Sequence, residues 1–263
     1  MKRKLIVAAA MMLAVGGLTA CSSGPDKEKV MQKTIDGFDR IRSAELDSNV
    51  KMTVGSGNSR SGNMDMDMNV TYTTKPKASK VVVKSKLANG SSNVIEAVCD
   101  SSDVYIRMPS MGKWYRKPAS SYDTVSRSKD QSVETAAKYL RMMKKNKVDY
   151  EIGSKGGNYV LTFNAGKKFT DKLKRDIFTQ MSSTGSTRLS SSALDRIDFK
   201  KFKYVIEVDK RRCLPKNYRI DLKMTVENGG SKGTVNELCK GTYRNVNSVK
   251  KIEIPSSYID LTK

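Results

Sequence analysis

The sequence of 263 residues contains no histidine, and only three cysteines follow Cys21. Histidine is the most common general base, metal ligand and pH-sensing side chain, so its absence excludes the familiar catalytic triads. No Gly-rich loop stands between a strand pattern and a helix pattern, where it would hold a phosphate. We therefore expect no enzymatic activity, no cofactor and no bound metal ion.

The sequence also lacks any long hydrophobic run except one at its start. Lys2, Arg3 and Lys4 form a cationic start, and residues 5–18 are free of charge. As a helix this run would cover about 21 Å, which is shorter than the roughly 30 Å hydrocarbon core of a bilayer. Residues 1–20 therefore have the pattern of an export signal that is removed, not of a permanent membrane span.

The end of this leader, Leu18-Thr19-Ala20-Cys21, resembles the lipobox of bacterial lipoproteins. We expect the lipoprotein signal peptidase to recognise Leu18, Thr19 and Ala20, and Cys21 to carry acyl chains such as palmitate. Two or three chains are enough for stable anchoring. Residues 21–26 would then tether the domain within about 20 Å of the extracytoplasmic face of the cell membrane. The alternative is an ordinary secretory leader followed by a chance cysteine.

No Pro-rich linker or abrupt change of composition divides the rest of the chain. Residues 27–263 are therefore predicted to form one domain. Loss of the leader would lower the formal charge from +22 to +19. Such a charge favours anionic lipid head groups or anionic cell-wall polymers as partners, whereas export argues against nucleic acid. A solvated cationic surface that binds nothing is the alternative interpretation.

Three cysteines remain after the lipidated one. Outside the cytoplasm a disulfide is permitted, and Cys213 with Cys239 would close a loop across two consecutive strand patterns. Cys99 follows Ile95 and Ala97 on one face of a predicted strand. We therefore expect Cys99 to be a buried thiol.

Helical and strand periodicities alternate along the domain. Apolar residues recur at intervals of three and four over residues 27–42, 131–145 and 170–181, which predicts three amphipathic helices, the second capped by Asp130. Strict alternation of apolar and polar residues predicts antiparallel strands with one solvent-exposed and one buried face. Such segments include 50–54, 64–72, 158–164, 202–208, 218–226 and, near the end of the chain, 250–254. The prediction is an α+β domain with a highly curved antiparallel sheet of about ten or eleven strands.

The predicted inner faces are rich in methionine. Flexible thioethers fill irregular cores and also line surfaces that accept varied apolar ligands, so core filling and ligand binding both stay open. The residues predicted to line a cavity are Met64, Met66, Met68, Tyr72, Leu140, Met143, Ile177, Met181, Tyr204, Ile206, Ile220, Leu222 and Met224. Asp65 and Asp67 share the opposite face, but no turn glycine or further acid completes a calcium loop around them.

Several short segments carry a resemblance to a known architecture. They are Val104-Tyr105-Ile106-Arg107, Gly112-Lys113-Trp114-Tyr115-Arg116, Leu214-Pro215 and Ile252-Glu253-Ile254-Pro255. With the helix that precedes them, they resemble uncharacterised Gram-positive lipoproteins similar to the lipoprotein carrier LolA and to mycobacterial glycolipid-binding lipoproteins such as LppX. The resemblance implies a half-barrel whose concave apolar side is covered by helices, and lipid or acyl chains held between the two.

Two functions follow from these observations. The first is a membrane-anchored protein that binds a hydrophobic or amphiphilic ligand, such as a lipid or the acyl chains of a lipoprotein, in the half-barrel. The alternative is a cationic interaction module that binds a cell-wall polymer or a protein partner and has no ligand cavity.

Overall fold

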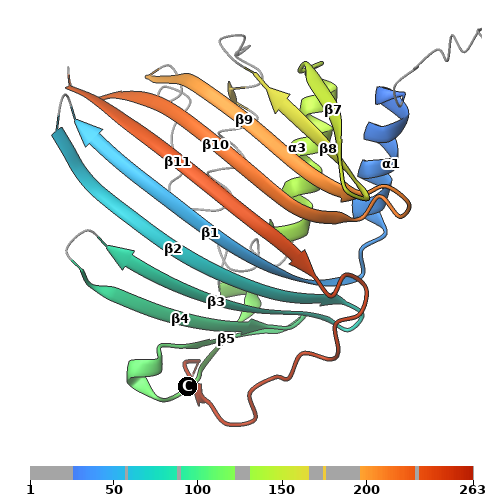
Figure 1. The fold of residues 1–263 in the computed structure, drawn as a ribbon. Helices are drawn as coiled ribbons and strands as arrows, with labels where there is room; N and C mark the ends of the chain where they lie inside the picture. Colours follow the sequence, from blue (N-terminus) through green and yellow to red (C-terminus); the bar gives the residue numbers. More distant parts are fainter. Residues whose placement is uncertain are drawn as a thin grey trace, which may run out of the picture.

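The chain folds around one twelve-stranded sheet (Figure 1). The computed structural model describes residues 26–56, 59–87, 90–121, 131–165, 174–175, 196–228 and 231–262. The predicted leader, lipobox and Cys21 lie outside these residues. So do Asp130 and most of the predicted helix 170–181, including Ile177 and Met181.

The regular elements follow the chain in two groups. The first comprises α1 (Lys27–Asp39), β1 (Ser43–Ser56), β2 (Ser59–Thr74), β3 (Lys77–Leu87), β4 (Ser92–Cys99), β5 (Asp103–Arg107) and β6 (Tyr115–Pro118), with short 3-10 turns at Pro109–Met111 and Ala119–Ser121. The second comprises α3 (Gln131–Lys145), β7 (Tyr150–Lys155), β8 (Asn158–Asn164), β9 (Ile197–Asp209), β10 (Pro215–Asn228), β11 (Ser231–Arg244) and β12 (Ile259–Asp260).

Strands β1 to β6 and strands β7 to β11 form two antiparallel meanders, and the pairing of β1 with β11 joins them into one sheet. Strand β12 pairs in parallel with β6. The strand order is β12-β6-β5-β4-β3-β2-β1-β11-β10-β9-β8-β7. At the junction Leu46 lies opposite Tyr243 and Val50 lies opposite Cys239. Because paired residues face the same side, the apolar sets of the two meanders form one continuous inner face.

The sheet curves around α1 and α3, which lie against its inner face (Figure 1). Helix α1 is capped at its N-terminus by Asp26, whose side chain accepts a hydrogen bond from the backbone N–H of Lys29. Its buried side carries Met31 and Phe38, while Leu140 and Met143 of α3 are fully buried in the same core. This arrangement confirms the predicted α+β half-barrel. Within the described part of the chain, neither helix has the length and apolar character needed to cross a bilayer.

A second, smaller core lies on the outer face, where the C-terminal segment crosses β3, β4 and β5. Ile252 packs there with Ala78, Val98 and Tyr105. Arg116 then pairs with Asp103 at 3.1 Å and with Asp260 of β12 at 2.9 Å. The predicted strand 250–254 is therefore wrong. Its two isoleucines, Ile252 and Ile254, belong to a segment without strand structure and pack against this small core on the outer face.

The β9–β10 turn is the point where α1 touches the sheet most closely. Cys213 occupies this turn with φ 55°, a left-handed conformation that a side chain disfavours. A Cβ added to Gly37 of α1 would lie 2.0 Å from the Cys213 carbonyl oxygen. The helix therefore depends on a glycine in its last turn for its contact with the sheet.

Substitution Gly37→Ala should destabilise the fold, although alanine favours helices by about 1 kcal/mol over glycine. The added methyl group has no space against the backbone of the turn, and overpacking of this kind costs about 1–3 kcal/mol. Urea unfolding followed by circular dichroism would measure the change. Gly62→Ala is the matched control, since a Cβ at Gly62 would meet no atom within 4 Å. Equal stability of the two variants would contradict the tight contact.

Candidate functional site

The inner face of the sheet is closed at one end and partly open at the other. Over β8, β9 and β10 the side chains of Phe163, Phe202 and Tyr204 are at most 1% exposed beneath α3. At the opposite end of β1 to β4 the inward side chains of Met52, Met64, Met66 and Val83 are half-buried, and those of Val54, Leu87 and Ile95 are 38–40% exposed. We call this second region the inner strip. Its members are Met52, Val54, Met64, Met66, Val83, Leu87 and Ile95.

The structure brings most of the predicted cavity residues to the inner face, but in two environments. Leu140, Met143, Tyr204, Ile206 and Leu222 are 0–2% exposed and form the packed core between α3 and the sheet. Tyr72 is also buried, and Met68, Ile220 and Met224 pack against this core as partly buried residues. Met64 and Met66 belong to the inner strip. Whether these residues line a cavity remains a prediction.

Polar groups interrupt the inner face next to the inner strip. The Tyr218 hydroxyl lies 3.0 Å from Ser48 Oγ, and Cys239 Sγ donates to the same hydroxyl at 3.6 Å. The Tyr218 ring fits there because Gly241 is opposite: a Cβ on Gly241 would lie 2.0 Å from a ring carbon. Burial raises the pKa of the Cys239 thiol to about 11, so this thiol stays protonated at neutral pH.

Glu237 belongs to the same face, two residues before Cys239 on β11. It lies opposite Met52 of β1 and Leu222 of β10. Burial raises the pKa of its carboxyl group. Burial also raises the pKa of the Tyr139 hydroxyl on α3, and the negative charge of Glu237 raises it further. Glu237 is a site residue that was not predicted from the sequence. Alternation places residues 235, 237, 239 and 243 on one strand face, but only the pairing shows that Met52 and Leu222 flank Glu237.

The predicted Cys213–Cys239 disulfide is wrong: both cysteines are buried thiols outside any disulfide. Cys213 sits in the β9–β10 turn, next to Pro215, whereas Cys239 lies opposite Ile220. Five residues of strand at about 3.3 Å each separate the two positions, whereas a disulfide needs Cα atoms within about 7 Å. Cys99 is 1% exposed, as predicted.

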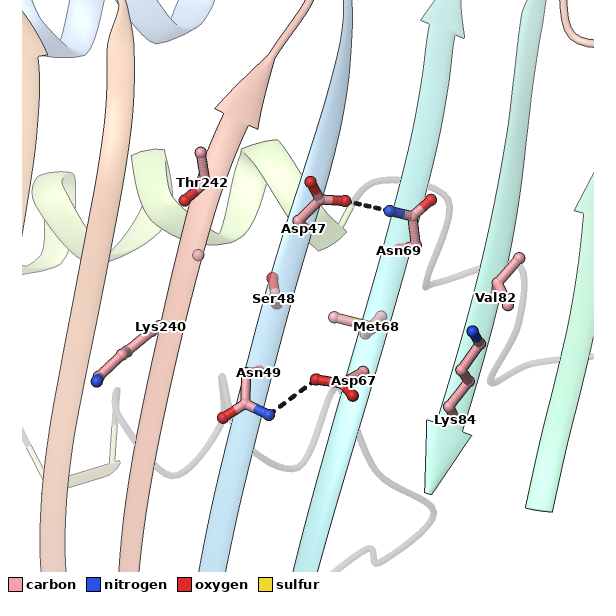
Figure 2. Close-up of a pocket in the computed structure, with 11 residues that line it drawn as sticks. Asp47, Ser48, Asn49, Asp67, Met68, Asn69, Val82, Lys84, Lys240 and Thr242 are labelled. Carbon is pink, nitrogen blue, oxygen red and sulfur yellow. Dashed lines mark hydrogen bonds between the residues drawn. The ribbon is translucent and has the colours of Figure 1, made fainter. Parts of the chain in front are cut away.

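The outer face carries a polar groove over β1, β2, β3 and β11 (Figure 2). It has a volume of about 570 Å³ and is open to solvent. Asn49 Nδ2 donates to Asp65 Oδ1 and Asp67 Oδ1 at 2.8 Å each, and Asn69 donates to Asp47. These acids therefore satisfy their hydrogen bonds across the strands, as expected for a solvated face. No group of acidic or sulfur ligands within the described ranges is arranged to hold a metal ion.

A basic cluster lies beside this groove, on the outer face of β9, β10 and β11. Lys201 is directly opposite Lys223, and Arg219 is directly opposite Lys240, although like charges at such positions repel. The acid Asp221 lies among them, 2.6 Å from Lys201 Nζ and 3.8 Å from Arg219. We call Lys201, Lys203, Arg219, Lys223 and Lys240 the outer basic cluster.

Comparison with protein families finds a match over residues 26–263 to the family described as "Family of unknown function (DUF6612)". No curated protein matches the sequence.

Three solved structures are similar to the chain at low identity. The first is a DUF1329 family protein from Desulfovibrio piger (11% identity, 89% of this chain and 97% of that chain covered, TM-score 0.24). The second is a beta-barrel-like protein of the domain of unknown function DUF1849 from Brucella abortus (7%, 78% and 99%, TM-score 0.24). The third is the S-type phycobiliprotein lyase CPES from Guillardia theta (7%, 84% and 98%, TM-score 0.23).

Proposed function

Since this chain belongs to the DUF6612 family, whose function is unknown, we propose a role from its own surfaces. We propose that it is a lipid-anchored, extracytoplasmic protein whose inner strip holds a hydrophobic or amphiphilic ligand, such as a lipid or acyl chains. The proposal assigns it no catalytic role, no cofactor and no nucleic-acid partner.

The partial exposure of the inner strip is the observation that carries this proposal. Single exposed apolar residues are normal on protein surfaces, but here they gather on one concave face of four adjacent strands. Each Å² of apolar surface removed from water contributes about 25 cal/mol. An acyl chain laid along Val54, Met66 and Ile95 would therefore gain affinity from burial without rearrangement of the packed core.

The anchor supports this role because it would hold the strip close to a source of lipid. The lipobox ends at Cys21, and the described fold begins at Asp26 with the cap of α1. The short connection leaves the domain near the bilayer surface, where amphiphiles are concentrated.

Replacement of Cys21 by alanine should abolish acylation of the protein. Cys21 carries the thiol that is acylated in this proposal, and loss of two or three chains removes the anchoring free energy that they supply, which is about 0.8 kcal/mol for each buried CH₂. Fractionation of expressing cells and labelling with an alkyne palmitate analogue would measure this. Ser22→Ala is the matched control and should remain acylated. A C21A protein that still labels would contradict the anchor.

The inner strip can be tested with decanol as a probe and with the chain from Ser22 onward, which keeps every described residue. Met66→Gln should raise the Kd for decanol about five- to tenfold, because about 1–1.4 kcal/mol of apolar contact is lost. The neighbouring Asp67→Asn faces the outer side and should leave the Kd within twofold of the original. Calorimetric titration measures both. Binding that is unaffected by M66Q, or no binding at all, would count against the proposal.

The outer basic cluster favours a second candidate, an interaction module that binds an anionic cell-wall polymer. Lys201 and Lys223 lie directly opposite each other, and their repulsion destabilises the fold when no anion is bound. A bound polyanion would offset this repulsion. In this candidate the half-barrel serves only as a packed support.

Lipoteichoic acid, a polyanionic wall polymer, is a suitable probe for this candidate. The double variant Arg219→Gln/Lys223→Gln should weaken its binding more than Lys250→Gln/Lys251→Gln, which removes the same charge from the C-terminal segment. Binding should also fall steeply between 50 and 500 mM salt, because salt screens the attraction between the exposed cations of the cluster and the anionic polymer. Equal effects of the two double variants in surface plasmon resonance would exclude the cluster as the binding surface.

A further inference from the structure

Glu237 is an acid on the apolar side of the sheet. Along β11 it alternates with outward Asn236 and Leu238, and its register partners Met52 and Leu222 both face inward. Leu222 is 2% exposed, whereas Met52 is half-buried and belongs to the inner strip. Glu237 therefore stands at the boundary between the packed core and the inner strip.

No described side chain neutralises this carboxylate. On the elements packed around it, the charge of Glu237 acts on the Tyr139 hydroxyl of α3 and the Cys239 thiol of β11, and both of these groups are neutral at physiological pH. Within the described residues Glu237 takes part in no hydrogen bond and no ion pair. By contrast, the outward acid Glu227 on β10 lies 4.0 Å from Lys232.

A second polar group lies on the inner face, in the packed core. The Tyr204 hydroxyl is completely buried, and none of the described residues gives it a hydrogen-bond partner. Its ring lies 5.9 Å from that of Tyr139, and its hydroxyl interacts electrostatically with Tyr139, Tyr218 and Cys239. A buried polar group without a partner costs about 1–3 kcal/mol. Tyr204 is enclosed in the packed core, whereas Glu237 is partly exposed beside the inner strip, so Glu237 is the group that a ligand can reach.

We propose that Glu237 is the counter-ion for the head group of a cationic amphiphile, an amine whose alkyl chain lies on the inner strip. This inference rests on the proposed function, because it uses the same strip for the chain. The half-buried Met52 side chain connects the two parts: it neighbours Glu237 across the β1–β11 pair and Met64 across the β1–β2 pair.

The inner face and the rest of the molecule are expected to attract amphiphiles of opposite charge. Without Lys2, Arg3 and Lys4 the chain from Ser22 onward has a formal charge of +19, which attracts anionic amphiphiles and repels cationic ones over long range. Non-specific binding would therefore favour decanoate over decylamine. A preference for decylamine would have to arise locally, where an unpaired carboxylate meets apolar walls and where low polarity strengthens the ion pair.

The test titrates the chain from Ser22 onward with decylamine, decanol and decanoate at pH 7.5. The unmodified chain should bind decylamine at least tenfold more tightly than decanoate. Glu237→Gln should lose about tenfold in decylamine affinity and leave decanol affinity within twofold. The matched control Glu227→Gln removes the same charge from the outer face and should leave all three unchanged.

Two further readouts separate recognition from a structural role of Glu237. Decylamine affinity should fall as the pH is lowered through the raised pKa of Glu237, because protonation removes the counter-charge, and E237Q should lack this dependence. E237Q should also raise the Tm of the ligand-free chain at pH 7.5, since it removes a carboxylate that burial penalises. A structural role would lower the Tm.

Equal binding of all three probes, or decylamine binding that E237Q leaves unchanged, would overturn this inference and leave the proposed function standing. No binding of any probe would overturn the proposed function, and this inference with it.

Discussion

The pairing of β1 with β11 is the constraint on which the rest of the molecule depends. Each meander is local in sequence, but this pairing joins strands from opposite ends of the domain and sets Leu46 against Tyr243. A shift by one residue would turn Lys240 inward and Cys239 outward, because side chains alternate along a strand. The inner strip, the packed core beneath α3 and the outer basic cluster all exist as separate surfaces because this register holds.

Local periodicity was enough to predict the elements that bury one face. The predicted helix over residues 131–145 matches α3, and the strand over 158–164 matches β8, since both have a clear apolar side. The inward placement of Met64, Met66 and Met68 followed from alternation alone. Asp65 and Asp67 took the solvated face for the same reason.

Features that depend on pairing between distant segments were beyond sequence analysis. Residues 250–254 alternate like a strand, yet Ile252 serves a small core built by Val98 and Tyr105, which no local pattern reveals. The disulfide prediction failed because the register of β10, not the order of the cysteines, decides which residues meet. Glu237 was missed because a single acid among half-buried positions is conspicuous only once Met52 and Leu222 are known to flank it.

The short parallel strand β12 covers one edge of the open sheet. An open sheet ends in two edges, and an unpaired edge strand can add strands from another chain. Ile259 and Asp260 pair with Tyr115 and Arg116, so two residues cover the backbone of edge strand β6. The opposite edge, β7, is short and carries charged Glu151 and Lys155. The half-barrel thus stays open for its inner face while its rims resist edge-to-edge aggregation.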